Sequence, residues 1–191
     1  IRKKKYALCL VNSWEHRIHN ESFYKQGKLL KQFIQPEFKS KRLAEERIAN
    51  MRKQNDIIVA VHIRRGDYKT FLDGKFFFTD EFYVEKMLQI NNLLYPSKVG
   101  FAIFSNENIQ LTAFKKLIFS FSVDNTAIGD MWGISLCDFI IGPLSTFSMW
   151  ASFWRNVPIL FLESKTTINS MEMFSPVIAQ DVQQKGQIVF N

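Results

Sequence analysis

The chain has 191 residues, 47% of them hydrophobic, which is enough for one sizeable domain with a buried core. It contains no run of about 18 apolar residues, so no membrane-spanning helix is predicted. The 25 Lys and Arg residues outnumber the 18 Asp and Glu residues and give a net charge of +7. Because these cations are spread along the chain and the aromatic residues do not interleave with them, the pattern argues against nucleic-acid binding. It suits an anionic small ligand or an anionic membrane surface.

The first part of the chain predicts one strand and one helix. Residues 6–11 form a short apolar run that predicts a buried strand. Residues 37–54 predict a helix, because Ala44, Ile48 and Met51 share one face and charged residues cover the rest.

From residue 57 onward, strands and helices are predicted to alternate. Residues 57–63 are apolar at almost every position and rich in β-branched residues, which is typical of a strand buried on both faces of a parallel sheet. Further strands are predicted at 99–105, 138–144 and 157–163, and helices at 79–94, 107–118, 130–137 and 145–154. This alternation predicts an α/β fold with a doubly wound parallel sheet. Ligands of such sheets bind beyond the carboxyl ends of the strands, so the residues that follow each strand are the candidate site.

The first strand of this alternation ends in the sequence HIRRGDY, residues 62–68. Arginine forks such as Arg64 and Arg65 bind phosphate oxygens bidentately, and Gly66 lets the backbone approach a ligand closely. Asp67 can orient an arginine or act as a carboxylate near the reacting centre. A surface turn with a solvated charge pair is the structural alternative, but the position after a buried strand favours a binding function.

Residues 65–67 also spell Arg-Gly-Asp, the tripeptide of adhesion ligands. An adhesive tripeptide must protrude on a flexible exposed loop, whereas this one directly follows a buried strand. The sequence therefore favours a ligand-binding turn over an adhesion module.

Polar residues follow two other predicted strands. Ser105 and Asn106 come after the strand at 99–105, where they either cap a following helix or contact a ligand. Ser145 and Thr146 stand at the predicted start of a helix, where free backbone N–H groups and the helix dipole favour a phosphate. Capping alone would also call for Ser or Thr there. With arginines one strand end away, we interpret these residues as part of a diphosphate site.

Several cofactor motifs are absent from the sequence. It contains no GxxxxGK[ST] phosphate loop and no GxGxxG fingerprint, which disfavours ATPases and dinucleotide oxidoreductases. It has no Asp-x-Asp pair, and its three histidines show no metal-ligand spacing. We therefore expect a diphosphate to be bound by arginine and a helix dipole, with no metal and no cofactor.

Three segments carry a resemblance to a known family. Residues 62–68 match the HxRRGDY signature of the α1,2-fucosyltransferases, glycosyltransferase family 11. FSNE at 104–107 resembles that family's FSDD segment, and DMWGISLCDFIIGPLSTFSMWASF resembles its D-x-x-x-M-S-x-C and N-S-T-F-S-W-W-G-A block, with Leu144 in place of the Asn. The three segments agree in order and approximate spacing and cover roughly residues 56–160.

The resemblance implies an inverting, metal-independent enzyme that transfers L-fucose from GDP-fucose to a galactose-type hydroxyl of a glycan in α1,2 linkage. It implies a Rossmann-like, GT-B-like fold with two lobes, of which the second binds the donor. We expect residues 1–55 to be the remnant of a truncated N-terminal, acceptor-side lobe and residues 56–191 to be the donor-binding domain. The composition fits a bacterial cytoplasmic enzyme, with peripheral association at the inner membrane.

The resemblance also implies roles for individual residues. Arg64 is expected to bind the donor diphosphate with help from Arg65, and Arg64 and Asp67 are the candidate catalytic residues. The predicted donor site comprises His62, Arg64, Arg65, Gly66, Ser105, Asn106, Asp130, Ser145, Thr146 and Phe147. Two alternatives stay open: a transferase that uses another nucleotide-diphosphate sugar, and a non-catalytic fragment that binds the nucleotide sugar without transfer.

Overall fold

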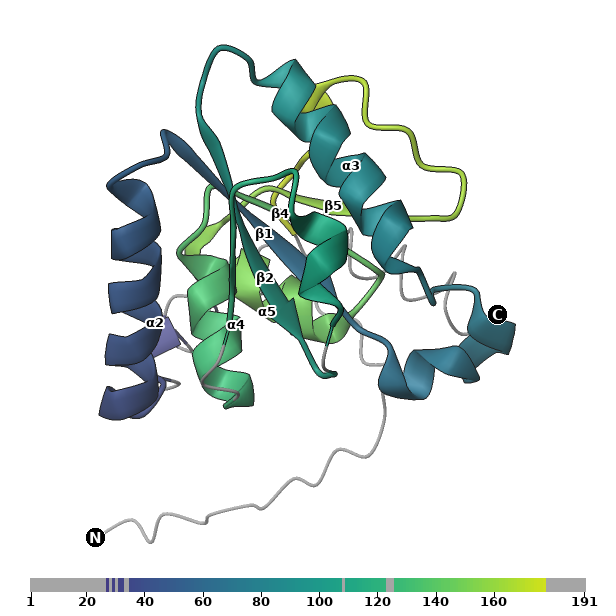
Figure 1. Ribbon diagram of the computed structural model, residues 1–191. Helices are drawn as coiled ribbons and strands as arrows, with labels where there is room; N and C mark the ends of the chain where they lie inside the picture. The colour runs from purple at the N-terminus through teal and green to yellow at the C-terminus, as the bar shows by residue number, and fades with distance from the viewer. Residues whose placement is uncertain are drawn as a thin grey trace, which may run out of the picture.

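The computed structural model describes residues 35–107, 109–122 and 126–177, together with positions 27, 29, 31 and 32. Within these residues, five parallel strands form one sheet, and helices lie against both of its faces (Figure 1). The strands are β1 (Ile57–Ile63), β2 (Val99–Ser105), β3 (Phe119–Phe121), β4 (Phe139–Gly142) and β5 (Ile159–Phe161). The α-helices are α2 (Phe38–Arg52), α3 (Asp80–Leu93), α4 (Ala127–Ser135) and α5 (Thr146–Arg155). Short 3₁₀ helices lie at η1 (Gly66–Lys69), η2 (Phe71–Gly74), η3 (Leu111–Phe114) and η4 (Met171–Met173).

The strand order is β3-β2-β1-β4-β5, with β1 in the centre. The chain first builds outward from β1 through β2 to β3, and then returns to the other side of β1 with β4 and β5. The order therefore reverses between β1 and β4, and in open α/β sheets the crevice at such a point is the usual ligand site.

The core is divided between the two faces of the sheet. On one face, α2, α4 and α5 pack over alternate strand residues such as Ala60 and Phe104. On the other face, α3 and η3 cover the intervening residues, such as Val59 and Val61. Every residue of β2, and every residue of β1 except Ile57, is buried, which explains why both strands are continuously apolar.

The predicted doubly wound α/β fold is confirmed, and several elements have the predicted positions. The strands at 57–63 and 99–105 have the predicted bounds. The helix predicted at 79–94 begins at Asp80, because the Thr79 hydroxyl caps it by accepting a hydrogen bond from the Phe82 N–H (3.3 Å).

The helix predicted at 107–118 is wrong. This segment instead contains the single turn η3, and it is followed by the short strand β3, which the sequence analysis missed. Ile118, the last residue of the predicted helix, is 55% exposed, while its carbonyl accepts a hydrogen bond from the Phe101 N–H (2.9 Å). Pairing with β2 therefore overrides the apparent helical spacing, and a strand of three residues is too short for its alternation to be recognised.

Two further features concern regions outside the sheet. The strand predicted at residues 6–11 lies outside the described residues. In the described part of the chain, no helix is both long and apolar enough to cross a membrane.

Candidate functional site

A pocket of about 420 Å³ opens at the carboxyl edge of the sheet. Its walls are formed by the ends of β1 and β2 and the starts of α4 and α5, beside the reversal between β1 and β4. The pocket is lined by His62, Arg64, Phe104, Ser105, Asn106, Ala127, Asp130 and Phe147. His62, Arg64, Ser105 and Asn106 were predicted from the strand ends, and Asp130 and Phe147 from the family resemblance. Phe104 and Ala127 were not, because apolar residues next to a strand end give no chemical signal.

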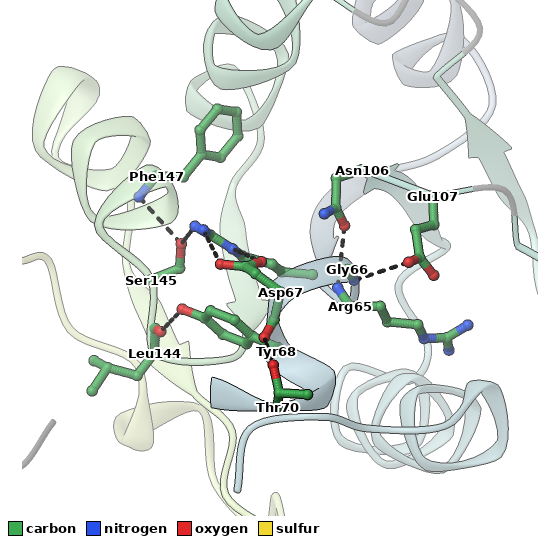
Figure 2. A network of polar contacts seen from close by, with 11 residues as sticks. Arg65, Gly66, Asp67, Tyr68, Thr70, Asn106, Glu107, Leu144, Ser145 and Phe147 are labelled. Carbon is green, nitrogen blue, oxygen red and sulfur yellow. Dashed lines mark hydrogen bonds and ion pairs between the residues drawn. The ribbon is translucent and has the colours of Figure 1, made fainter. Parts of the chain in front are cut away.

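Arg64 is held in place from two sides. Its Nη2 and Nε donate hydrogen bonds to the two carboxylate oxygens of Asp67, at 2.8 and 3.2 Å, and its Nη1 donates to the Ser145 hydroxyl at 3.2 Å. The guanidinium also lies over the Tyr68 ring, 4.7 Å from its centroid. Figure 2 shows Asp67 and Ser145 close together at the centre of this network. The side chain remains 31% exposed, so the cation is both oriented and accessible.

Tyr68 ties the turn after β1 to the loop between β4 and α5. Its hydroxyl donates a hydrogen bond to the Leu144 carbonyl at 2.6 Å (Figure 2). Burial raises the pKa of Tyr68 above its ordinary value, so the hydroxyl stays protonated as a donor. The two strand ends on either side of the crevice are thus joined by a buried bond.

Helix α5 begins beside Arg64. The Ser145 hydroxyl caps this helix by accepting a hydrogen bond from the Phe147 N–H (3.3 Å), and it also accepts the bond from Arg64. Ser145 is therefore buried behind the arginine, while the Phe147 ring lines the pocket. Thr146 is exposed and is not part of the pocket wall. Both explanations for Ser145, cap and site residue, are consistent with these contacts.

Two side chains that follow β2 hold the turn after β1 by accepting hydrogen bonds from the backbone of that turn. The side-chain Oδ1 of Asn106 accepts the Arg65 N–H (3.1 Å), and a Glu107 carboxylate oxygen accepts the Gly66 N–H (3.0 Å) (Figure 2). The same Glu107 oxygen also accepts a hydrogen bond from Lys69 Nζ (3.3 Å). A Cβ atom at Gly66 would lie 2.9 Å from the Asn106 amide nitrogen, so this close approach favours glycine. Asn106 thus positions the turn, and neither it nor Ser105 caps a helix.

The Arg65 side chain turns away from the pocket. Its Nε donates to the Phe78 carbonyl (3.2 Å) and its Nη2 to the Asp80 carboxylate (2.5 Å). The side chains of Arg65 and Asp80 are only 12% and 11% exposed, so this is a largely buried structural ion pair. The arrangement also argues against an adhesion tripeptide, because Arg65 is not presented at the surface.

His62 is the last residue of β1 whose side chain lines the pocket. It is buried, its Nδ1 has no hydrogen-bond partner among the described residues, and its ring lies 5.2 Å from the Phe147 ring. Burial, and then the charge of Arg64, lower the pKa of His62 to about 3. The imidazole is therefore neutral at ordinary pH, and it offers hydrogen-bonding atoms without adding charge.

Asp130 supplies a carboxylate on the opposite flank of the pocket from Ser145. It lies in the first turn of α4, and its Oδ1 accepts a hydrogen bond from the Ser122 hydroxyl, just after β3, at 2.6 Å. Burial raises the pKa of Asp130, while the Ser122 bond and the charge of Arg47 oppose that rise. Asp130 is bonded to Ser122, which follows β3, and Arg64 is bonded to Ser145, which follows β4. Because β3 and β4 lie on opposite sides of β1 in the sheet, the pocket has a cationic flank at Arg64 and an anionic flank at Asp130.

The described residues contain no group of three or more His, Cys, Asp or Glu side chains that could hold a metal ion. The expectation that a ligand is bound without metal remains a prediction.

Comparisons with known proteins bear on the family and the fold. The model of the family "Glycosyl transferase family 11" matches residues 4–175. The galactoside alpha-(1,2)-fucosyltransferases 2 of Rattus norvegicus and Mus musculus are each 27% identical over 136 residues, covering 66% of this chain. This chain spans only 38% and 39% of their respective lengths.

A solved structure has a similar fold. The crystal structure of POFUT1 in complex with GDP superposes with a TM-score of 0.52 at 12% sequence identity, covering 70% of this chain and 47% of that one. This likeness supports the Rossmann-like, GT-B-like fold class that the sequence predicts.

Proposed function

This chain belongs to glycosyl transferase family 11, and from that premise we propose that its pocket binds GDP-fucose and serves the transfer of L-fucose to a galactose-type hydroxyl of a glycan. The relatives that it matches carry α1,2-fucosyltransferase names, and the structural neighbour was crystallised with GDP. The chain spans about two fifths of those relatives, so donor, acceptor and linkage are all parts of the proposal.

The observation that carries the proposal is the geometry of Arg64. Its fork is fixed by Asp67 and Ser145 at the start of α5, yet it remains accessible from the pocket. An accessible guanidinium beside a helix N-terminus is suited to the oxygens of a diphosphate, because the fork donates bidentately and the helix dipole favours negative charge. We assign the diphosphate to this flank.

The opposite flank suits a guanine base. Guanine presents two neighbouring donors, N1–H and the 2-amino group, and a carboxylate accepts both in the same bidentate manner that it accepts an arginine fork. Asp130 is the carboxylate of the pocket, and the Ser122 bond occupies only its Oδ1 from one side. His62 and Phe104 lie between the flanks and provide neutral walls for the nucleoside.

In the proposed reaction, the acceptor hydroxyl oxygen forms a bond to the anomeric carbon of fucose from the face opposite the diphosphate. The bond from that carbon to the β-phosphate oxygen breaks, its electron pair leaves with GDP, and the acceptor proton passes to a base. Negative charge therefore grows on the leaving group, where Arg64 and the start of α5 stabilise it. No metal is required for this role, and the configuration at the anomeric carbon is inverted.

Asp67 has two candidate roles in this reaction. It orients Arg64 through two hydrogen bonds, and it is also a carboxylate near the proposed leaving group. The bonds to Arg64 lower the pKa of Asp67, which makes it a weaker base. We therefore propose that its main role is to position Arg64.

A second candidate function is nucleotide-sugar binding without transfer. It is favoured by one observation, the fraction of the relatives' length that the chain spans. Binding measurements alone do not separate the two functions, whereas a transfer assay does.

The test is calorimetric titration of the chain with GDP-fucose, GDP-mannose, UDP-galactose and GDP, first with EDTA and then with Mg²⁺, followed by a transfer assay with a galactoside acceptor. We expect GDP and GDP-fucose to bind equally well with and without metal, and Arg64→Ala to abolish binding. Lys69→Ala is the matched control, because it removes a cation from the same turn. In the described structure the Lys69 Nζ donates to Glu107 and does not line the pocket, so binding should stay intact. Equal binding of UDP-galactose, or full binding by Arg64→Ala, would contradict the proposal, and donor binding without transfer would support the second function.

A further inference from the structure

A second hollow, of about 290 Å³, lies behind the anionic flank of the pocket. It is enclosed by α2, the end of β3 and the start of α4, and it shares Phe104 and Asp130 with the pocket. Any side chain that fixes these two residues from behind therefore acts on the pocket wall without touching what the pocket binds. Arg47, on α2, is in that position.

Arg47 is attached to the carboxyl ends of two strands. Its Nη2 donates to the carbonyls of Ile103 (3.0 Å) and Ser120 (2.6 Å), and its Nε donates to the Ser120 hydroxyl (3.1 Å). Its guanidinium lies over the Phe104 ring, 4.5 Å from the centroid. The side chain thus holds β2 and β3 together and supports a residue that lines the pocket.

We propose that Arg47 is a positioning residue that, together with Ser122, holds the Asp130 carboxylate and the Phe104 ring in the geometry that selects a guanine base. This inference rests on the proposed function, because it assumes that Asp130 faces the base. It adds a determinant of specificity that does not itself contact the ligand.

The charges around Asp130 explain why this arginine matters. The charged and titratable groups that share the two cavities with it are Arg47 and Glu46 from α2, His62 from β1 and Arg64 after β1. Arg64 is assigned to the diphosphate and bonded to Asp67, and the buried His62 is neutral. Arg47 is therefore the cation that offsets the burial of Asp130, even though the two side chains form no direct ion pair in the described structure.

Without Arg47, the carboxyl group would gain a proton more readily. A protonated carboxyl presents one donor and one acceptor to the base, and so it cannot accept from both N1–H and the 2-amino group of guanine. Loss of Arg47 should then weaken the binding of guanine nucleotides more than the binding of other nucleotides. If the role of Arg47 were purely structural, its loss would instead weaken the binding of all nucleotides alike.

The experiment compares GDP with IDP, which lacks the 2-amino group, by titration of the full chain between pH 5 and 8. The wild type should bind GDP roughly ten- to a hundred-fold tighter than IDP, since one hydrogen bond to a charged acceptor is lost. In Arg47→Met, that ratio should fall about tenfold, and the pH below which GDP binding is lost should move upward. Arg47→Lys, which keeps the charge without the fork, should lie between the two, and Ser122→Ala should also lower the ratio.

Arg52→Met is the matched control. Arg52 also leaves α2 and donates both to a carboxylate, Asp138 (2.9 Å), and to a carbonyl, Leu136 (2.9 Å), but it does not line either cavity. Loss of Arg52 should lower the stability of the fold and leave the ratio of GDP affinity to IDP affinity unchanged.

Three results would overturn the inference. An unchanged ratio and pH profile in folded Arg47→Met would do so, as would an equal fall of the ratio in Arg52→Met. If Arg47→Met does not fold, an unchanged ratio in both Arg47→Lys and Ser122→Ala would have the same meaning. A wild type that does not prefer GDP over IDP would instead contradict the proposed reading of guanine by Asp130, and this outcome is distinguished because it appears before any substitution is made.

Discussion

The two neighbouring arginines that follow β1 face different regions of the molecule. Arg64 faces the pocket and pairs with Asp67 in a partly exposed ion pair, whose side chains are 31% and 56% accessible. Arg65 faces the N-terminus of α3 and pairs with Asp80 in a largely buried ion pair, whose side chains are 12% and 11% accessible. Identical side chains one residue apart thus lie in very different surroundings.

This difference in surroundings indicates that the two arginines have different roles. A partly exposed ion pair contributes little to stability, so Arg64 can exchange part of its contact with Asp67 for the proposed diphosphate at small cost. A buried pair is costly to break, because the remaining charge is left without a partner in a poorly hydrated site. Arg65 is therefore a fixed anchor of the turn, and Arg64 is the arginine available to a ligand.

The largest effect should follow from breaking the anchor. Arg65→Met leaves the Asp80 carboxylate buried without its cation, which should lower the free energy of unfolding by about 3–5 kcal/mol. Urea denaturation measures this change. The double variant Arg65→Met with Asp80→Asn serves as the control and should recover part of the loss. A loss below about 1 kcal/mol would show that the pair behaves like a surface pair.

The next largest effect concerns the pocket arginine and appears in turnover. Arg64→Lys retains a positive charge but loses the planar fork, so fucose transfer should fall by roughly a hundred- to a thousand-fold, or about 2.7–4 kcal/mol in the transition state. The measurement is kcat/KM for GDP-fucose, with denaturation to check the fold. Arg52→Lys, made in a pair remote from the pocket, should retain activity. Near-normal turnover in Arg64→Lys would rule out the proposed role of the fork.

The contrast between the two arginines also marks how far the sequence predicts the site. The buried strand at 57–63 follows from its continuous apolar run, and the site at its end follows from the rule for parallel sheets. The direction of Arg65 does not follow, because Asp80 is 15 residues away in sequence and is brought near only by tertiary packing. Arg47 was missed for the same reason: on an amphipathic helix, it has the pattern of a solvated charge, yet it is half-buried and hydrogen-bonded to two strand ends.

A third test concerns burial next to the arginines, at His62. Its pKa in the folded chain is about 3, against 6.5 for the ordinary side chain, so the unfolded chain binds the proton first as the pH falls. The stability that His62 contributes is complete above about pH 6.5 and declines toward pH 3, by roughly 2 kcal/mol at pH 5. The free energy of unfolding, measured at pH 7 and 5, should therefore fall less in His62→Leu than in the wild type. Equal slopes would show that His62 is hydrated in the folded chain.

The smallest effect on stability is expected at Asp67, whose substitution decides between its two roles. Asp67→Asn should change the free energy of unfolding by less than about 1 kcal/mol, because the pair with Arg64 is partly exposed. If Asp67 only orients Arg64, transfer should fall by less than about tenfold, since an amide oxygen still accepts from the guanidinium and Ser145 holds its other side. If Asp67 is instead the base, transfer should fall by about a hundred- to ten-thousand-fold, and the acidic limb of the pH–rate profile should disappear. We expect the smaller loss, because the bonds from Arg64 that make Asp67 a good anchor also lower its pKa and weaken it as a base.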